Sequence, residues 1–282
     1  MTFQLIHRLF IVDLERAMER GMDTLLWTKA KQLVDRVREE SGSDRNSNFE
    51  NVVSLCISWL CDLSLNVYSK YQLPPIDIPS FICLSPALRV NQTIPFPQTT
   101  GNSFLAFLCL RLGDLFRYKG HYDLCSHLYH CSLRAKPSLG DAWNQLGVLA
   151  APLDSLYFNT RALHCPIPFT PAAANISNLF RKYSDKGRCW RLSTVFIPHL
   201  ICQHTITDVR EDDCFSDQYL AILNQLRPDL LLCIALLLRV PCVCRNEPSL
   251  VAALSRSHQD VIFDSEKLET FRYQCFFSTP YL

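Results

Sequence analysis

The feature that most constrains the fold of this chain is a repeat of 34 residues in its middle third. Three residues recur at this offset, namely Leu112 as Leu146, Gly113 as Gly147 and Pro137 as Pro171, and Cys109 corresponds in position to Trp143. A repeat of this length accommodates two antiparallel helices and the turns between them. Gly113 and Gly147 are expected to allow close approach of the paired helix, because they carry no side chain. Tyr129 is then expected to fill the space between two helices, and Pro137 to end the second one.

The period, with Trp-x-x-Leu-Gly near its start and Pro at its end, is typical of tetratricopeptide repeats. Apolar residues recur at helical spacing through most of the remaining chain, starting with Leu5, Leu9 and Val12. Residues 73–101 are rich in proline and are expected to form a long loop insertion. We therefore predict an all-α fold, with an array of antiparallel helix pairs over residues 1–186 and a helical extension over residues 187–282.

The composition excludes several classes of protein. With 28 Lys and Arg against 27 Asp and Glu, the net charge of +1 creates no field that would attract nucleic acid or anionic membrane, so any anion site must be local. The longest apolar run, Leu230–Leu238, is too short to span a bilayer, and we expect a soluble protein without a membrane partner. The N-terminus has no pattern of a signal peptide, and the 14 cysteines are therefore expected to be reduced, mostly buried thiols.

No pattern of a catalytic or cofactor site is present. The sequence contains no glycine-rich phosphate loop, no nucleophile elbow and no His-Glu-x-x-His. His127, His130 and Cys131 are close in sequence, but neither they nor the other Cys and His residues have the paired spacing of a structural zinc site. We therefore predict that the protein is not an enzyme and has no metal and no cofactor.

The segment LRLGDLFRYKGHYDLC, residues 110–125, places Arg117 and Tyr118 at the end of an apolar helix. A guanidinium group is always charged and offers a planar fork of donors that matches a phosphate group. Arg117 would lie near the concave groove in which helical repeat arrays bind peptides. From position alone, the simpler interpretation is an ion pair with Asp114, which is three residues earlier on the same helix.

Three segments, Leu112–Tyr118, Asn144–Ala150 and Phe169–Leu179, together with LLWTKAK upstream, resemble the SMG family of nonsense-mediated mRNA decay factors, which includes the telomerase-associated Est-type proteins. The resemblance covers about residues 5–186. It implies a 14-3-3-like domain of tetratricopeptide-like helix pairs, whose groove binds phosphoserine or phosphothreonine peptides. The ligand that the family implies is the phosphorylated Upf RNA helicase.

The resemblance also implies roles for individual residues. Arg117 matches the phosphate-binding arginine of the family, and Tyr118 beside it would donate a phenolic hydrogen bond. Asn144 matches an asparagine that would hold the backbone of the ligand. The resemblance thus favours phosphate contact over the internal pair for Arg117.

A second basic residue of the pocket is implied on the helix that follows Leu26-Trp27, where Lys29 and Lys31 are the candidates. They are two residues apart, so they point to nearly opposite sides of a helix and only one can face the groove. Lys31 is closer to the expected position. Its alternative is a surface ion pair with Asp35, four residues on.

As a whole, the sequence predicts a phosphopeptide-binding adaptor of mRNA surveillance. By resemblance, its other partners would be a second SMG family member in a heterodimer and a protein phosphatase, and it would reside in the cytoplasm with possible shuttling to the nucleus. Two alternatives remain at this stage. One is a tetratricopeptide-type scaffold for unmodified proteins, in which Arg117 is structural. The other is an Est-type protein that binds telomeres or nucleic acid, which the near-zero net charge disfavours.

Overall fold

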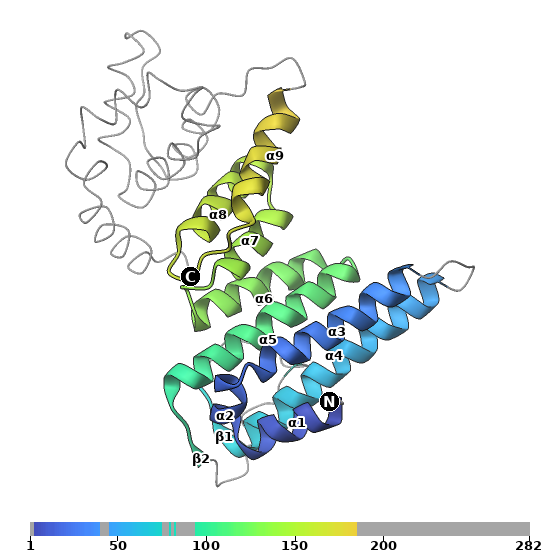
Figure 1. The fold of residues 1–282 in the computed structure, drawn as a ribbon, viewed down its shortest axis with the longest axis vertical. Coiled ribbons are helices and arrows are strands. Elements are labelled where there is room, and N and C mark those ends of the chain that lie inside the picture. The colour runs from blue at the N-terminus through green and yellow to red at the C-terminus, as the bar shows by residue number, and fades with distance from the viewer. Residues whose placement is uncertain (1–2, 40–44, 75–78, 80–81, 83–93, 185–282) are drawn as a thin grey trace, which may run out of the picture. The chain divides into compact units, whose positions relative to one another are not determined.

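The computed structural model describes residues 3–39, 45–74, 79, 82 and 94–184. Within these residues it contains nine helices and two strands of two residues each, which confirms the predicted all-α class. The chain divides into two compact units, Met1–Pro137 with helices α1 to α6 and Ser138–Leu282 with helices α7 to α9 (Figure 1). The predicted extension over residues 187–282, and the predicted boundary at 186, lie outside the described residues.

The first unit is built from helix pairs. Its helices are α1 (Phe3–Val12), α2 (Leu14–Glu19), α3 (Met22–Glu39), α4 (Arg45–Lys70), α5 (Gln98–Tyr118) and α6 (Tyr122–Ala135). Strands β1 (Tyr71–Gln72) and β2 (Ile94–Pro95) pair in parallel. Helices α3 and α4 lie side by side and run in opposite directions, and so do α5 and α6 (Figure 1).

Helix α5 is the centre of the first unit. Its residues 104–110 are all buried, whichever side of the helix they occupy, as are Leu112 and Leu115. A helix that is apolar on all sides must be covered by neighbours. Helices α2, α3, α4 and α6 all contact it. The last turn of α5, which carries Arg117, therefore continues a helical segment that is buried on all sides.

Helix α4 is the one segment of the described residues that is long and apolar enough, by length and composition, to cross a membrane. Its buried side chains recur every three or four positions, namely Val53, Cys56, Leu60, Leu63 and Val67. This spacing forms one face, and the helix packs against α1, α3 and α5. We therefore assign α4 to the core of the first unit.

The first helix buries a different row of side chains from the one expected. Leu5, Leu9 and Val12 are 48%, 39% and 70% exposed, whereas Ile6 and Phe10 are fully buried. Helix α1 has apolar residues on two adjacent rows, so its spacing alone does not select the inner one. The core selects Phe10, whose ring lies 5.9 Å from that of Phe104 on α5.

The loop insertion is shorter than predicted, because α5 begins at Gln98 rather than after residue 101. Thr99, Thr100 and Gly101 have low helix propensity, which hid the first turn in the sequence. Tertiary packing compensates for this low propensity: a side chain at Gly101 would lie only 2.9 Å from Pro74, so the loop crosses directly over the helix at this point.

The second unit contains α7 (Gly140–Leu149), α8 (Pro152–His164) and α9 (Ala172–Ser184). Helix α7 packs on α8, and α8 packs on α9. Arg161 of α8 is 1% exposed and donates a hydrogen bond to the Tyr157 hydroxyl at 3.0 Å. Its guanidinium carbon also lies 4.5 Å from the centre of the Trp143 ring on α7. This buried cation joins α7 to α8 through the Trp of the repeat.

The structural roles predicted for the repeat are confirmed in each unit. A Cβ atom at Gly113 would lie 2.5 Å from the ring of Tyr129 on the paired helix α6, and Tyr129 is fully buried. A Cβ atom at Gly147 would likewise lie 2.7 Å from the Asn159 amide on the paired helix α8. Helix α6 ends at Ala135, just before Pro137. The repeat therefore corresponds to the pairs α5–α6 and α7–α8.

The described cysteines are free thiols, and most are buried. Burial raises the pKa of Cys56, Cys61 and Cys125 from 9.0 to about 11 in each case. The charged thiolate is disfavoured because these groups lose contact with water.

Gly113→Ala is predicted to destabilise the protein by about 1–3 kcal/mol, because the added methyl group collides with a Tyr129 ring that is held in place. Elsewhere in a helix the same change stabilises by up to about 1 kcal/mol, so the sign of the effect is diagnostic. Chemical denaturation measures it, and Gln32→Ala at an exposed position of α3 is the control. A Gly113→Ala variant as stable as the wild type would contradict the close packing.

Alkylation of Cys56, Cys61 and Cys125 by iodoacetamide is predicted to be slow at pH 8 in the native protein and to accelerate about tenfold per pH unit up to pH 11. Since the folded pKa of about 11 exceeds the reference value of 9.0, these thiols contribute stability that is complete below pH 9.0 and is lost as the pH rises towards 11. Mass spectrometry of alkylated peptides measures the rates. Labelling as fast as in the urea-unfolded chain would refute the prediction.

Candidate functional site

Arg117 lies in the last turn of α5, where the helix dipole favours a cation. Its side chain is 24% exposed. The Nε atom donates a hydrogen bond to the Tyr129 hydroxyl at 3.3 Å. Nη2 lies 3.8 Å from Oδ1 of Asp114, so the ion pair expected from position alone is present, at a distance too long for a hydrogen bond. The terminal nitrogens of the guanidinium form no hydrogen bond with any described residue. Tyr129 thus holds Arg117 through Nε, whereas the terminal nitrogens of Arg117 keep hydrogen-bond donors that no described residue uses.

Asp114 is the carboxylate around which this end of α5 is organised, and its side chain is only 3% exposed. Oδ2 accepts a hydrogen bond from Nη1 of Arg111 at 3.0 Å, and Oδ1 accepts one from the Tyr129 hydroxyl at 3.0 Å. Burial raises the pKa of Asp114, and Arg111 and then Arg117 oppose that rise by favouring the ionised form. Asp114 therefore faces two guanidinium groups, that of Arg111 in a direct hydrogen bond and that of Arg117 in a longer ion pair.

The ring of Tyr118 makes cation–π contacts with two arginines. The guanidinium carbon of Arg117 is 5.1 Å from the centre of its ring, and that of Arg38 on α3 is 4.9 Å from it. Arg38 also lies 5.4 Å from the ring of Phe49 on α4. These cation–π contacts hold three helices together at the end of α5. Burial, and secondarily the charge of Asp114, raise the pKa of the Tyr118 phenol, so it is a hydrogen-bond donor at neutral pH.

The structure places the two candidate lysines on opposite flanks of α3. Trp27 lies against Arg111 and Arg38 lies against Tyr118, so the stripe of α3 that faces this part of α5 contains both. Lys31, four residues after Trp27 and seven before Arg38, is on that stripe and is exposed. Lys29 lies on the other flank. Among the described ion pairs Asp35 is bound to Arg38, at 3.7 Å, and the alternative pair of Asp35 with Lys31 is not formed.

Asn144 belongs to the second unit, whereas the other four predicted site residues belong to the first. It is 5% exposed, and its Oδ1 atom accepts a hydrogen bond from Nδ2 of Asn175 at 2.8 Å. Nδ2 of Asn175 is also 3.3 Å from Oδ1 of Asn159, which links α7, α8 and α9. The Nδ2 group of Asn144 has no hydrogen-bond partner among the described residues. A cavity of about 460 Å³, lined partly by Asn159, Asn175 and Asn178, lies beside this network.

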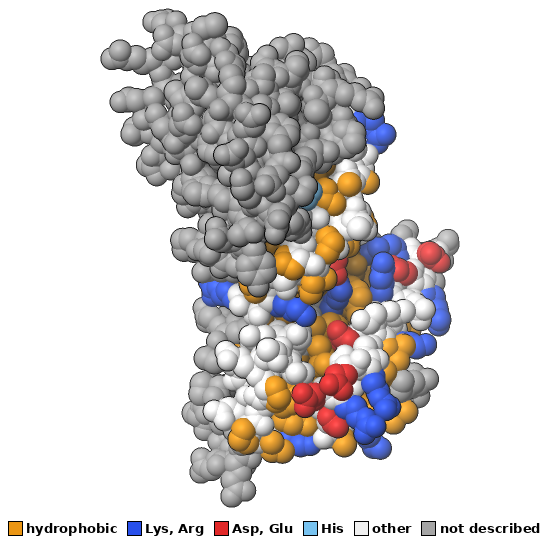
Figure 2. Space-filling view, turned by 60° about the vertical axis from the view of Figure 1, so that its left-hand side comes forward, with side chains coloured by type: hydrophobic (Ala, Val, Ile, Leu, Met, Phe, Trp, Pro, Cys, Tyr) orange, Lys and Arg blue, Asp and Glu red, His pale blue; other side chains and the backbone are white. Residues whose placement is uncertain are grey.

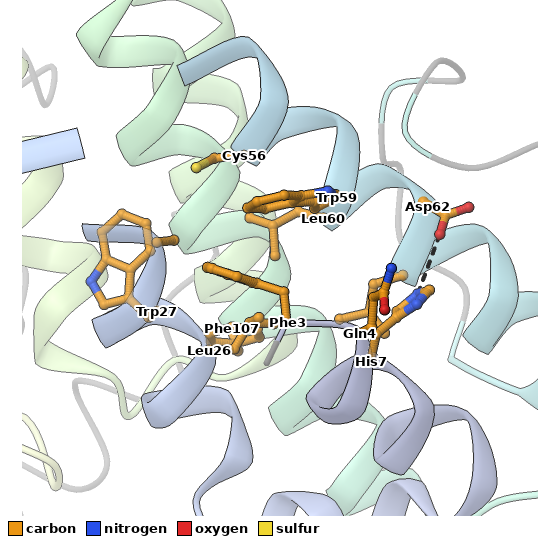
Figure 3. Close-up of a pocket in the computed structure, with 12 residues that line it drawn as sticks. Phe3, Gln4, His7, Leu26, Trp27, Cys56, Trp59, Leu60, Asp62 and Phe107 are labelled. Carbon is orange, nitrogen blue, oxygen red and sulfur yellow. Dashed lines mark ion pairs between the residues drawn. The ribbon is translucent and has the colours of Figure 1, made fainter. Parts of the chain in front are cut away.

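A second cavity, of about 270 Å³, lies within the first unit among α1, α3, α4 and α5. Figure 3 shows Phe3 beside Trp59, with ring centres 4.3 Å apart, and His7 directed at Asp62, whose carboxylate lies 3.4 Å away. The lining is mainly aromatic and aliphatic and includes no lysine or arginine. It is therefore unsuited to a phosphate group. Trp27, which lines this cavity, makes a cation–π contact with the guanidinium of Arg111.

Sequence analysis missed Arg111 and Arg38 as members of the cationic cluster. Arg111 could have been found from spacing, since it lies three residues before Asp114 and six before Arg117 on one helix. Arg38 could not, because only tertiary packing brings α3 to Tyr118. On the face drawn in Figure 2, basic and acidic side chains lie near one another. The described residues contain no group of three or more His, Cys, Asp or Glu side chains that could hold a metal ion.

No family model matches the sequence. Among curated proteins, the chain is 23% identical over 195 residues to nonsense-mediated mRNA decay factor SMG7 of Danio rerio and 34% identical over 186 residues to nonsense-mediated mRNA decay factor SMG5 of the same organism. The resemblance to the SMG family is confirmed. The alignments include 63% and 58% of this chain but only 16% and 17% of SMG7 and SMG5, so the chain spans a small part of the length of these relatives.

Among solved structures, the chain is similar in fold to a chain in the SMG5–SMG7 complex of C. elegans. The TM-score is 0.69 at 24% sequence identity, and the match covers 95% of this chain and 72% of the other. This likeness confirms the predicted 14-3-3-like helical fold.

Proposed function

We propose that this chain is a phosphopeptide-binding adaptor of nonsense-mediated mRNA decay, with Arg117 as its central phosphate ligand. The proposal rests on the hydrogen bonding of the Arg117 guanidinium. Its terminal nitrogens form no hydrogen bond with a described residue, and the nearest carboxylate, Asp114, is bound more closely by Arg111. A doubly charged phosphate group is the ligand that best uses such a fork of donors.

The remaining predicted residues have chemically distinct tasks in this proposal. Lys31, exposed on the stripe of α3 that faces α5, adds a second positive charge. Tyr118 donates its phenolic hydrogen to a phosphate oxygen. Asn144 uses its unpaired Nδ2 group to hold a carbonyl of the peptide backbone. Each charge-assisted bond contributes about 1.5–3 kcal/mol, so the phosphate would dominate the preference for a modified peptide.

The ligand in this proposal is a phosphorylated segment of the Upf RNA helicase, and the protein acts by binding rather than by catalysis. Because the neighbouring fold comes from a complex of SMG5 with SMG7, we further propose that this chain pairs with another SMG family member. A protein phosphatase that acts on the bound helicase, and a cytoplasmic location with shuttling to the nucleus, complete the proposal.

Arg117→Gln is predicted to weaken binding of a phosphoserine peptide of Upf sequence by about tenfold to a hundredfold, because one charge-assisted contact is lost. Binding of the same peptide without phosphate should hardly change. Fluorescence anisotropy measures both affinities, and thermal melting verifies that the variant is folded. Arg16→Gln, which removes an exposed arginine of α2, is the matched control for net charge.

Two results would favour the alternative functions. Equal affinity of the wild type for the phosphorylated and plain peptides would favour a scaffold for unmodified proteins, in which Arg117 only supports the fold. Tight binding of single-stranded nucleic acid that weakens steeply with salt would favour an Est-type nucleic-acid-binding protein.

Heterodimer formation is predicted to be visible as a complex of one chain each when this protein is mixed with the 14-3-3-like domain of an SMG family member. Size-exclusion chromatography with light scattering measures the mass. Serum albumin at the same concentration is the control for non-specific association. Separate elution of the two SMG-type domains at micromolar concentration would count against this partner.

A further inference from the structure

Asp114 at the end of α5 is paired with two arginines, and the geometry shows which of the two it binds more closely. Nη1 of Arg111 is 3.0 Å from Oδ2 of Asp114, a direct hydrogen-bonded ion pair. Nη2 of Arg117 is 3.8 Å from Oδ1 of the same group, which is too long for a hydrogen bond. The charge of Asp114 is therefore committed mainly to Arg111.

Arg111 is held in this position from its other side. Its guanidinium carbon lies 4.8 Å from the centre of the Trp27 ring on α3, and its side chain is only 18% exposed. A guanidinium stacked on an aromatic face has few alternative orientations, so its partner carboxylate is fixed as well.

Tyr129 forms a hydrogen bond with the other carboxylate oxygen of Asp114, Oδ1. Its hydroxyl donates to Oδ1 at 3.0 Å and accepts from Nε of Arg117 at 3.3 Å. The phenol thus bridges Asp114 and Nε of Arg117, while Nη2 of Arg117 stays 3.8 Å from the same carboxylate.

We propose that Arg111 is a positioning residue for Arg117: by taking the close hydrogen bond of Asp114, it limits Arg117 to a long ion pair and leaves the terminal donors of Arg117 available to a phosphate dianion. This inference rests on the phosphopeptide function proposed above. It assigns Arg111 an indirect role, without contact to the ligand.

The electrostatics of Asp114 explain what happens when Arg111 is removed. Burial already raises the pKa of this carboxyl group, and Arg111 is the strongest influence that keeps it ionised. A buried carboxylate that loses its partner must find another cation or take up a proton. Alkaline pH favours the ionised form, and Arg117, 3.8 Å away, is the cation within reach.

The test is a double-mutant cycle between Arg111→Met and Asp114→Asn, measured at pH 8 as the affinity for the phosphoserine peptide of Upf sequence and for its unphosphorylated twin. Methionine replaces the unbranched stem of arginine with an apolar side chain of similar length to that stem, which can pack near Trp27 but carries no charge. In the Asp114 background, Arg111→Met should weaken phosphopeptide binding by about tenfold, since Arg117 is then neutralised. In the Asp114→Asn background the same change should alter the affinity by no more than about threefold, because no carboxylate remains to capture Arg117.

Each other outcome overturns the inference. A similar loss in both backgrounds would make Arg111 a direct ligand of the phosphate, and no loss in either would make it a structural residue. Arg111→Lys keeps a positive charge beside Asp114 and should retain most of the binding. If thermal melting shows that Arg111→Met does not fold, Arg111→Lys and Arg111→Gln in both backgrounds complete the same cycle.

A measurement on the protein without peptide distinguishes this inference from the proposed function. In a nuclear magnetic resonance spectrum of ¹⁵N-arginine protein, exchange of the Arg117 Nη hydrogens with water should slow in Arg111→Met and recover when Asp114→Asn is added. This result together with equal wild-type affinity for both peptides would retain the role of Arg111 and refute the phosphopeptide function. Unchanged Arg117 exchange in Arg111→Met would refute the role of Arg111, whatever the peptide affinities.

Discussion

The buried carboxylate of Asp114 is the interaction on which this end of the molecule depends. A charged group at 3% exposure is costly unless hydrogen bonds and opposite charges replace water. Arg111 and Tyr129 provide the direct contacts, and each binds a different oxygen. Arg117 is then the cation that remains, and its inner edge is tied to the same tyrosine.

The glycine beside Asp114 makes this arrangement possible. Tyr129 reaches Asp114 only because its ring passes over Gly113, where any side chain would collide with it. The Leu-Gly-Asp segment therefore combines two requirements in consecutive residues, a close approach of two helices and a buried anion that receives the tyrosine hydroxyl. The second repeat uses Gly147 in the same way, but the residue that approaches it is Asn159, and the pair leads to an asparagine network instead of an ionic one.

Several elements of the fold were predictable because local signals agreed with the packing. The glycines at one offset of 34 residues and Pro137 after α6 correctly predicted the two helix pairs. The exceptions have local explanations. Helix α1 carries two apolar rows, so spacing could not tell that Ile6 and Phe10 would be the buried pair. The first turn of α5 consists of residues with poor helix propensity, and its packing against Pro74 is a long-range contact that no local pattern contains.

For the candidate site, the sequence by itself determined which functional groups are available: an arginine, a tyrosine and an aspartate at fixed spacing on one helix, with lysines on another. Helical periodicity also required that Lys29 and Lys31 lie on different sides of α3. Only the tertiary structure decided how the charges are shared. The distances from Asp114 to Arg111 and to Arg117 depend on Trp27 from α3 and Tyr129 from α6, which hold the guanidinium groups from opposite sides. Charge neutralisation depends on differences of less than 1 Å, and such distances arise from packing between helices rather than from spacing along one of them.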